Sequence, residues 1–185
     1  MLSRDAIAEK LKGMISEHRY IHSLGVEQTA ARLAALYGAD ETKCIIAGLA
    51  HDCAKSLSTE EQLAAVRRSG IVLYDGEERI DDVLHAPAGA VIAKEAFGIE
   101  DPDILSAIRY HTIGNEHMTL IEAIIYVADY IEPNRREHDG LQKVRDLAET
   151  DIYAAAAQAR ICTEEYCRSI GAEPFVFSKT SQTDA

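Results

Sequence analysis

The stretch that decides the fold is Gly48-Leu49-Ala50-His51-Asp52, in which an apolar segment ends in a histidine and an aspartate. Asp40 precedes the segment as an expected N-cap, and the apolar pattern between them predicts a buried helix. A carboxylate that is buried without a partner is costly, so Asp52 needs a cation, a hydrogen-bonded partner or solvent. The stretch therefore predicts an apolar helix that carries polar chemistry at its end.

The same pattern returns in Tyr126-Val127-Ala128-Asp129, where a carboxylate interrupts a second apolar helix. A mixed set of imidazoles and carboxylates suits a transition metal such as iron, manganese or zinc. One dyad alone does not decide the matter. The plain alternative is that His51 caps its helix and Asp52 pairs with an arginine.

Three other histidines lie near small residues at expected helix faces or ends. His22 follows Arg19 by three residues, which places the two on one helical face. His85 opens a His-Ala-Pro segment just before an expected helix, and His111 follows the end of another. The remaining histidines (His18, His117 and His138) are expected to be solvated surface groups.

Helical periodicity extends along almost the whole chain. The predicted helices cover residues 4–17, 19–37, 40–52, 58–68, 87–97, 101–110, 119–132, 140–148 and 151–170. Residues 71–74 look strand-like but are isolated, and we expect them in a packed loop. The pattern predicts one all-α domain over residues 1–185, in which 172–185 form a loose C-terminal tail.

Composition excludes several classes of partner. The 185 residues include 19 lysines and arginines against 31 aspartates and glutamates, a formal net charge of −12. This balance argues against broad binding to nucleic acid or to an anionic membrane, because phosphate contacts need clustered cations. The sequence has no apolar run long enough to span a membrane and no signal peptide at its start. We expect a cytoplasmic protein with four reduced cysteines, most of them facing the core.

The ordered set His22, His51-Asp52 and Asp129 resembles the H…HD…D signature of the HD-domain metal-dependent phosphohydrolases. His85 and His111 resemble the additional ligands of the two-metal members. More narrowly, five segments in order resemble the YqeK-type branch, known as symmetrical diadenosine tetraphosphate hydrolases with an iron-containing site. These segments are Arg19-Tyr20-Ile21-His22-Ser23, His51-Asp52-Cys53-Ala54-Lys55, His85-Ala86-Pro87, Tyr110-His111-Thr112 and Ala128-Asp129-Tyr130-Ile131-Glu132-Pro133-Asn134-Arg135.

The resemblance implies a compact HD-domain helical bundle that cleaves diadenosine tetraphosphate symmetrically to two ADP. In such an enzyme a metal-activated water attacks an inner phosphorus. The cofactor would be a divalent or mixed-valent transition metal, with iron as the first choice and two ions per site. The implied metal ligands are His22, His51, Asp52, His85, His111 and Asp129, with Asp52 as the natural bridge.

The residues expected to act in catalysis are His51, Asp52 and Lys55, which follows Asp52 by three residues. Lys55 would add a positive charge near the leaving group. Arginine offers a planar fork to phosphate oxygens, and a threonine can donate a hydrogen bond to them. The residues expected to contact the nucleotide are Arg19, Asp52, His85, His111, Thr112, Asp129 and Arg135. Glu132 is expected either to accept a hydrogen bond from a ligating imidazole or to lie at the surface or in a helix cap.

Two alternatives remain open at this point. The same metal pair could hydrolyse another nucleotide, either a monophosphate or a cyclic phosphodiester. A non-catalytic nucleotide sensor could use the same cations, although it has no need of six metal ligands. The partner is a dinucleoside polyphosphate or an ADP-like nucleotide in each favoured case. The sequence leaves metal identity, base preference and oligomeric state undecided, with a homodimer as one possibility.

Overall fold

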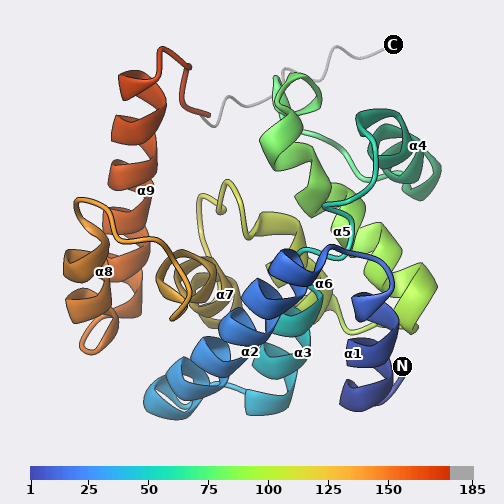
Figure 1. The fold of residues 1–185 in the computed structure, drawn as a ribbon, viewed down its shortest axis with the longest axis horizontal. Helices are drawn as coiled ribbons and strands as arrows, with labels where there is room; N and C mark the ends of the chain where they lie inside the picture. The colour runs from blue at the N-terminus through green and yellow to red at the C-terminus, as the bar shows by residue number, and fades with distance from the viewer. Residues whose placement is uncertain (176–185) are drawn as a thin grey trace.

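The computed structural model describes residues 1–175, apart from the side chains of Arg79 and Asp81. This part of the chain forms nine α-helices and one 3₁₀ turn and has no strand (Figure 1), which confirms the predicted all-α class. The elements are α1 (Arg4–Lys12), α2 (Glu17–Tyr37), α3 (Glu41–Ala50), α4 (Thr59–Ser69), η1 (Glu77–Arg79), α5 (Asp81–Phe97), α6 (Pro102–Tyr110), α7 (Leu120–Ile131), α8 (Leu141–Ala148) and α9 (Ile152–Ser169).

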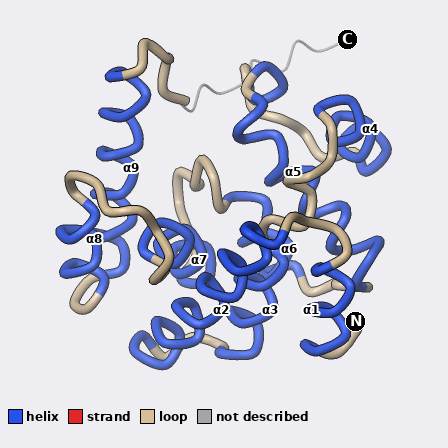
Figure 2. The backbone as a smooth tube through the Cα atoms, in the orientation of Figure 1, coloured by secondary structure: helices blue, strands red, loops and turns tan. Residues whose placement is uncertain are grey.

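The centre of the molecule is built from α2, α3 and α7, each of which packs against the other two. Leu33, Leu49 and Ile124, one from each helix, are fully buried there. Helix α6 packs against α3, α5 and α7, and α4 covers α5. The pair α8–α9 lies on the opposite side of α7 from α4 and α5 (Figures 1 and 2). The central helices therefore face helices on both sides.

Local capping signals define several helix ends as the sequence predicted. Ser58 and Glu61 form a reciprocal capping box at the start of α4, and Thr119 and Glu122 form another at α7. Asp101 caps α6, and Pro102 occupies its first turn. These ends were predictable because each depends on side chains only two or three residues from the backbone groups that they bond.

Two predicted helix boundaries are wrong. The first helix ends at Lys12, and Ser16 caps α2, accepting a hydrogen bond from the backbone N–H of Arg19. Helix α5 begins at Asp81 rather than at Pro87, so His85 lies inside the helix instead of before it. Proline removes a single N–H from the ladder, and this helix continues through that loss.

The segment at 71–74 is irregular, as expected, although it is only partly packed: Val72 is 79 % exposed. None of the four cysteines forms a disulfide, and Cys44, Cys53 and Cys162 are buried, in line with the sequence. No helix within residues 1–175 is long and apolar enough to cross a membrane. Most of the expected loose tail, residues 176–185, lies outside the described residues, and the single-domain assignment of residues 1–185 stays a prediction.

Candidate metal centre

Five separate helices bring six imidazole and carboxylate side chains together in the middle of the molecule. His22 comes from α2, His85 from α5 and Asp129 from α7. His51 and His111 are the C-cap residues of α3 and α6, and Asp52 follows His51. All but Asp129, whose side chain is 18 % exposed, are buried. The site thus draws on segments that lie far apart in the sequence.

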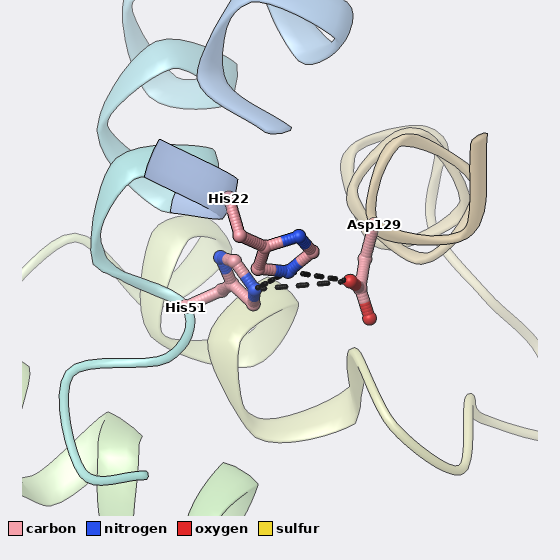
Figure 3. Close-up of side chains that lie close together, drawn as sticks. All are labelled: His22, His51 and Asp129. Carbon is pink, nitrogen blue, oxygen red and sulfur yellow. Dashed lines mark hydrogen bonds and ion pairs between the residues drawn. The ribbon is translucent and has the colours of Figure 1, made fainter. Parts of the chain in front are cut away.

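His22, His51 and Asp129 form one compact group (Figure 3). Nε2 of His22 lies 3.0 Å from Oδ1 of Asp129 and 3.3 Å from Nε2 of His51. Nε2 of His51 is 3.9 Å from the same carboxylate oxygen. Each residue therefore presents one ligand atom to a common point.

A second group surrounds the other side of Asp52. Nε2 of His85 lies 3.1 Å from Nε2 of His111, and both face Oδ1 of Asp52, at 3.1 Å and 3.7 Å. His51, Asp52 and His111 also present ligand atoms close enough to share an ion. His51 and His111 are neighbours, with ring centroids 4.8 Å apart. The two groups are therefore adjacent.

Asp52 lies between the two groups and gives one oxygen to each. Its Oδ1 faces His85 and His111, whereas its Oδ2 lies 3.6 Å from Nε2 of His51 and 3.9 Å from Nε2 of His22. This is the arrangement that a carboxylate bridging two ions requires.

Backbone and side-chain acceptors orient three of the imidazoles. Nδ1 of His51 lies 2.8 Å from the carbonyl oxygen of Gly48, and Nδ1 of His111 lies 2.8 Å from that of Ile108. A carbonyl only accepts, so the proton is on Nδ1 and the lone pair on Nε2. Nδ1 of His22 faces Oε1 of the buried Glu132 at 3.2 Å. In His51 and His111 the nitrogen turned toward the cluster is the one available to a metal, whereas Nε2 of His22 hydrogen-bonds to Asp129 and would give up its proton to bind an ion.

Burial and charge set the ionisation of the cluster. Burial lowers the pKa of His51 and that of His85 to about 4, so both rings are neutral at pH 7. Burial alone would raise the pKa of Asp52 and of Asp129, yet the surrounding histidines, together with Arg135 at Asp129, hold both pKa values well below their usual range. The hydrogen bond to Asp129 and the nearby carboxylates outweigh burial at His22 and raise its pKa.

This donor set fits a divalent transition metal. Neutral imidazoles and ionised carboxylates are the protonation states in which these groups bind metal. The Nε2 atoms of His85 and His111 approach each other to 3.1 Å. Oδ1 of Asp52 lies 3.1 Å from the first of these atoms and 3.7 Å from the second, so three ligand atoms can meet one cation. The residues present therefore fit a bound metal.

The plain alternative is correct in part, because Asp52 does meet an arginine. Nη1 of Arg19 lies 3.1 Å from Oδ2 of Asp52, as expected if Arg19 and His22 share a helical face. Nη2 of Arg135 lies 3.6 Å from Oδ1 of Asp129. The alternative does not explain why four imidazoles converge on one carboxylate. Both arginines are more than a third exposed, so they lie where the cluster meets solvent.

Lys55 and Thr112 lie beside the second group. Nζ of Lys55 is 3.1 Å from Nδ1 of His85 and 3.5 Å from Oδ1 of Asp82. Oγ1 of Thr112, next in sequence to His111, is buried and has no hydrogen-bond partner among the described residues. His18, His117 and His138 are exposed, as expected.

The sequence interpretation missed three residues around the cluster. A Cβ at Gly25 would collide with Oε2 of Glu132, so a glycine is needed for Glu132 to reach His22. A glycine inside a helix three residues after a candidate ligand was the available signal. Glu77 and Arg109 form a buried ion pair near His111. Arg109 could have been noticed as a charge on the otherwise amphipathic α6, two residues before that histidine.

Comparison with known proteins gives one family match and close relatives. The HD domain family matches residues 19–134. A protein from Halalkalibacterium halodurans named bis(5'-nucleosyl)-tetraphosphatase, symmetrical, is 42 % identical over 166 residues, which cover 88 % of this chain and 86 % of the relative. A Bacillus subtilis protein of the same name is 44 % identical over 158 residues, covering 85 % and 84 %.

One solved structure superposes on nearly the whole chain. It is the crystal structure of a "predicted HD superfamily hydrolase involved in NAD metabolism" from Clostridium acetobutylicum. The two chains share 42 % identity with a TM-score of 0.88, and the alignment covers 95 % of this chain and 92 % of the other. The similarity therefore extends over the helices on both sides of the metal centre.

Proposed function

The chain belongs to the HD domain family, and on that premise we propose that it hydrolyses diadenosine tetraphosphate symmetrically to two ADP. Water adds to one inner phosphorus, and the bond from this phosphorus to the central bridging oxygen breaks. The bridging oxygen leaves with the other ADP, and the proton released from water balances the charge. The relatives named for this activity align over most of their length and most of this chain.

The observation that carries the proposal is the position of Asp52 between two pairs of imidazoles. His22, His51 and Asp129 would hold one ion, His85 and His111 would hold the other, and Asp52 would join them. Such ions supply a hydroxide-like nucleophile at neutral pH and offset charge on phosphoryl oxygens. His51 and Asp52 would act in catalysis through this role.

Residues around the ligands would bind and orient the tetraphosphate. Arg19 and Arg135 carry fixed positive charge at the exposed side of the cluster and reach phosphate oxygens as planar donors. Lys55 would place a further positive charge near the leaving ADP, beside His85. The buried hydroxyl of Thr112 makes no hydrogen bond within the described part of the chain and would donate to a phosphate oxygen that enters the site.

Finer assignments belong to the same proposal. We assign iron as the metal, two ions as the stoichiometry, ADP as the nucleotide that the site binds after cleavage and the cytoplasm as the location. Imidazole and carboxylate ligands also accept manganese, zinc and nickel, so elemental analysis paired with activity across metals tests the choice of iron.

The activity is tested by chromatography of products from the purified protein. Diadenosine tetraphosphate should yield ADP alone, and hydrolysis in ¹⁸O-labelled water should place one label on the β-phosphate of half the ADP. A chelator should stop turnover, and added metal should restore it. Formation of ATP and AMP would contradict symmetrical cleavage. Phosphate release from mononucleotides, or cleavage of NAD, with the tetraphosphate left intact would assign a different substrate.

A further inference from the structure

A buried ion pair joins two segments that carry ligands of the second group. Glu77 and Arg109 are 32 residues apart, and two hydrogen bonds link them, from Nη1 to Oε1 at 2.6 Å and from Nη2 to Oε2 at 2.7 Å. The Glu77 side chain is fully buried and that of Arg109 is 8 % exposed. The two hydrogen bonds make the ion pair bidentate, and burial shields it from solvent.

Both partners lie directly beside a candidate ligand segment. Glu77 is in η1, immediately before α5, which carries His85. Arg109 is in the last turn of α6, two residues before His111. The ion pair therefore connects the segment before α5, which carries His85, to the C-terminal end of α6, which precedes His111.

Further contacts hold each partner in place. Oε2 of Glu77 accepts a hydrogen bond from the backbone N–H of Tyr74 at 2.7 Å. The Arg109 guanidinium lies over the rings of Tyr74 and Tyr110, at 5.6 Å and 5.0 Å from their centroids. The pair thus ties residues 74–77 to the C-terminal end of α6.

The N-cap position of α5 makes no capping hydrogen bond among the side chains that the structure describes. Its N-cap position is occupied by Ile80, which makes no side-chain cap hydrogen bond, unlike the residues that cap α2, α3, α4, α6 and α7. His85 is in the second turn of this uncapped helix. Its position relative to His111 therefore depends on tertiary contacts. These are the contacts of Lys55 with His85 and Asp82, the packing of α5 against α6, and the contacts that hold the segment before α5.

We propose that the Glu77–Arg109 pair is a positioning pair that sets the spacing of His85 and His111 and so the affinity of the second ion. This inference rests on the proposed two-ion function. The first group comes from α2, α3 and α7, none of which contains either partner. Loss of the pair should therefore affect one ion much more than the other.

The test measures Mn²⁺ binding by calorimetry and elemental analysis, after chelation and reloading of the full chain. Glu77→Gln keeps the shape and an acceptor for Tyr74 but removes the charge. We expect the dissociation constant of the second ion to rise about 10–100-fold, the range typical for loss of a residue that orients a metal ligand. The first ion should bind within threefold of the wild type, and raised Mn²⁺ should restore turnover.

Glu95→Gln is the matched control. Glu95 and Arg68 make the same two-pronged contact, at 2.9 Å and 2.7 Å, but on the exposed surface between α4 and α5. This variant should keep both ions at wild-type affinity. Circular dichroism and thermal unfolding confirm that each variant is folded.

Arg109→Lys provides a second variant, because it keeps the charge and loses the fork. Three results overturn the inference: both ions retained within threefold, both weakened equally, or a single ion in the wild type. Failure of both variants to fold would also overturn it, because the pair would then serve the whole fold. A wild-type protein that binds two ions but does not cleave the tetraphosphate would refute the proposed activity and leave this inference standing.

Discussion

Glu132 lies behind His22, with its Oε1 3.2 Å from Nδ1 of the imidazole, while Nε2 of the same ring faces Asp129 at 3.0 Å. The other oxygen of Glu132 accepts the backbone N–H of Asn134 at 2.7 Å. The carboxylate is therefore held at both oxygens and orients the ring toward the cluster. A carboxylate in this place also makes the imidazole a more basic ligand.

Gly25→Ala should weaken metal binding without touching a ligand. The new Cβ would collide with Oε2 of Glu132 and displace it from His22. We expect metal affinity to fall about 10–100-fold, as for the loss of a partner behind a ligand. Competition with a fluorescent chelator measures the change. Gly13→Ala is the control, because its Cβ would meet only an ordinary contact, and equal affinities in the two variants would contradict the assignment.

Asp52→Asn and His51→Ala should lose metal and turnover together. The asparagine keeps the shape of Asp52 but offers no negative charge to two ions. Turnover should fall by more than the roughly 10–100-fold loss that is typical when a residue that only orients a metal ligand is replaced. Elemental analysis and product chromatography on the same preparation check both losses, and retained turnover in Asp52→Asn would show that the bridging role is wrong.

Arg19→Ala and Arg135→Ala should weaken ADP binding and leave metal content unchanged. A charge-assisted contact contributes about 1.5–3 kcal/mol, or about a 10–150-fold rise in the dissociation constant. Lysine at either position should recover only part of the loss if the contact is bidentate. Calorimetry on the metal-loaded protein measures the change.

Arg32→Ala is the control for these variants, because Arg32 is on α2 as Arg19 is, but pairs with Glu149 on the surface. It should bind ADP as the wild type does. Lost metal in Arg19→Ala would mean that this arginine supports the ligands, and unchanged affinity in both variants would assign phosphate binding to other groups.

The metal-free protein should lose stability as the pH falls from about 6.5 to about 4. Burial lowers the pKa of His51 and His85 to about 4 in the folded chain, against about 6.5 in the unfolded one. The unfolded chain then binds more protons in this window, so stability falls with pH, by up to about 1.4 kcal/mol per unit for each ring. The raised pKa of His22 acts above this window, because the stability that it contributes is complete below about pH 6.5 and is lost only as the pH rises.

Urea unfolding in chelator at pH 7 and pH 5 measures this dependence. The two aspartates contribute little between these values, because their lowered pKa values place the corresponding loss below about pH 4. His85→Asn should show a shallower dependence. Equal or greater stability at pH 5 in the wild type would contradict the burial of neutral rings.

Local chemistry explains which parts of the fold could be predicted from the sequence. The capping boxes at Ser58 and Thr119 involve residues three apart, so the helix starts were visible in the sequence. Ser16 also caps a helix, but the charged residues around it extended the apparent first helix past its end. Pro87 suggested a helix start because proline favours the first turn, yet α5 tolerates it inside.

The convergence of the six candidate ligands was predictable from the resemblance, but their arrangement was not, and their roles stay a prediction. The resemblance named six ligand candidates, and the structure brings all six together. Which oxygen of Asp52 faces which ring depends on helix packing, and no spacing in the sequence encodes it. Glu77 and Arg109 are 32 residues apart and meet only in the folded chain, so the sequence around either residue did not predict the ion pair.

The ligands come from helices that begin and end at distant points of the chain, so a bound ion would act as a cross-link as well as a reagent. An ion present at 100 times its dissociation constant adds about 2.7 kcal/mol to the free energy of unfolding. A cell short of metal would then hold less of this protein, because unfolded chains are removed by proteolysis. Metal supply would therefore control both the turnover of each molecule and the amount of folded protein in the cell.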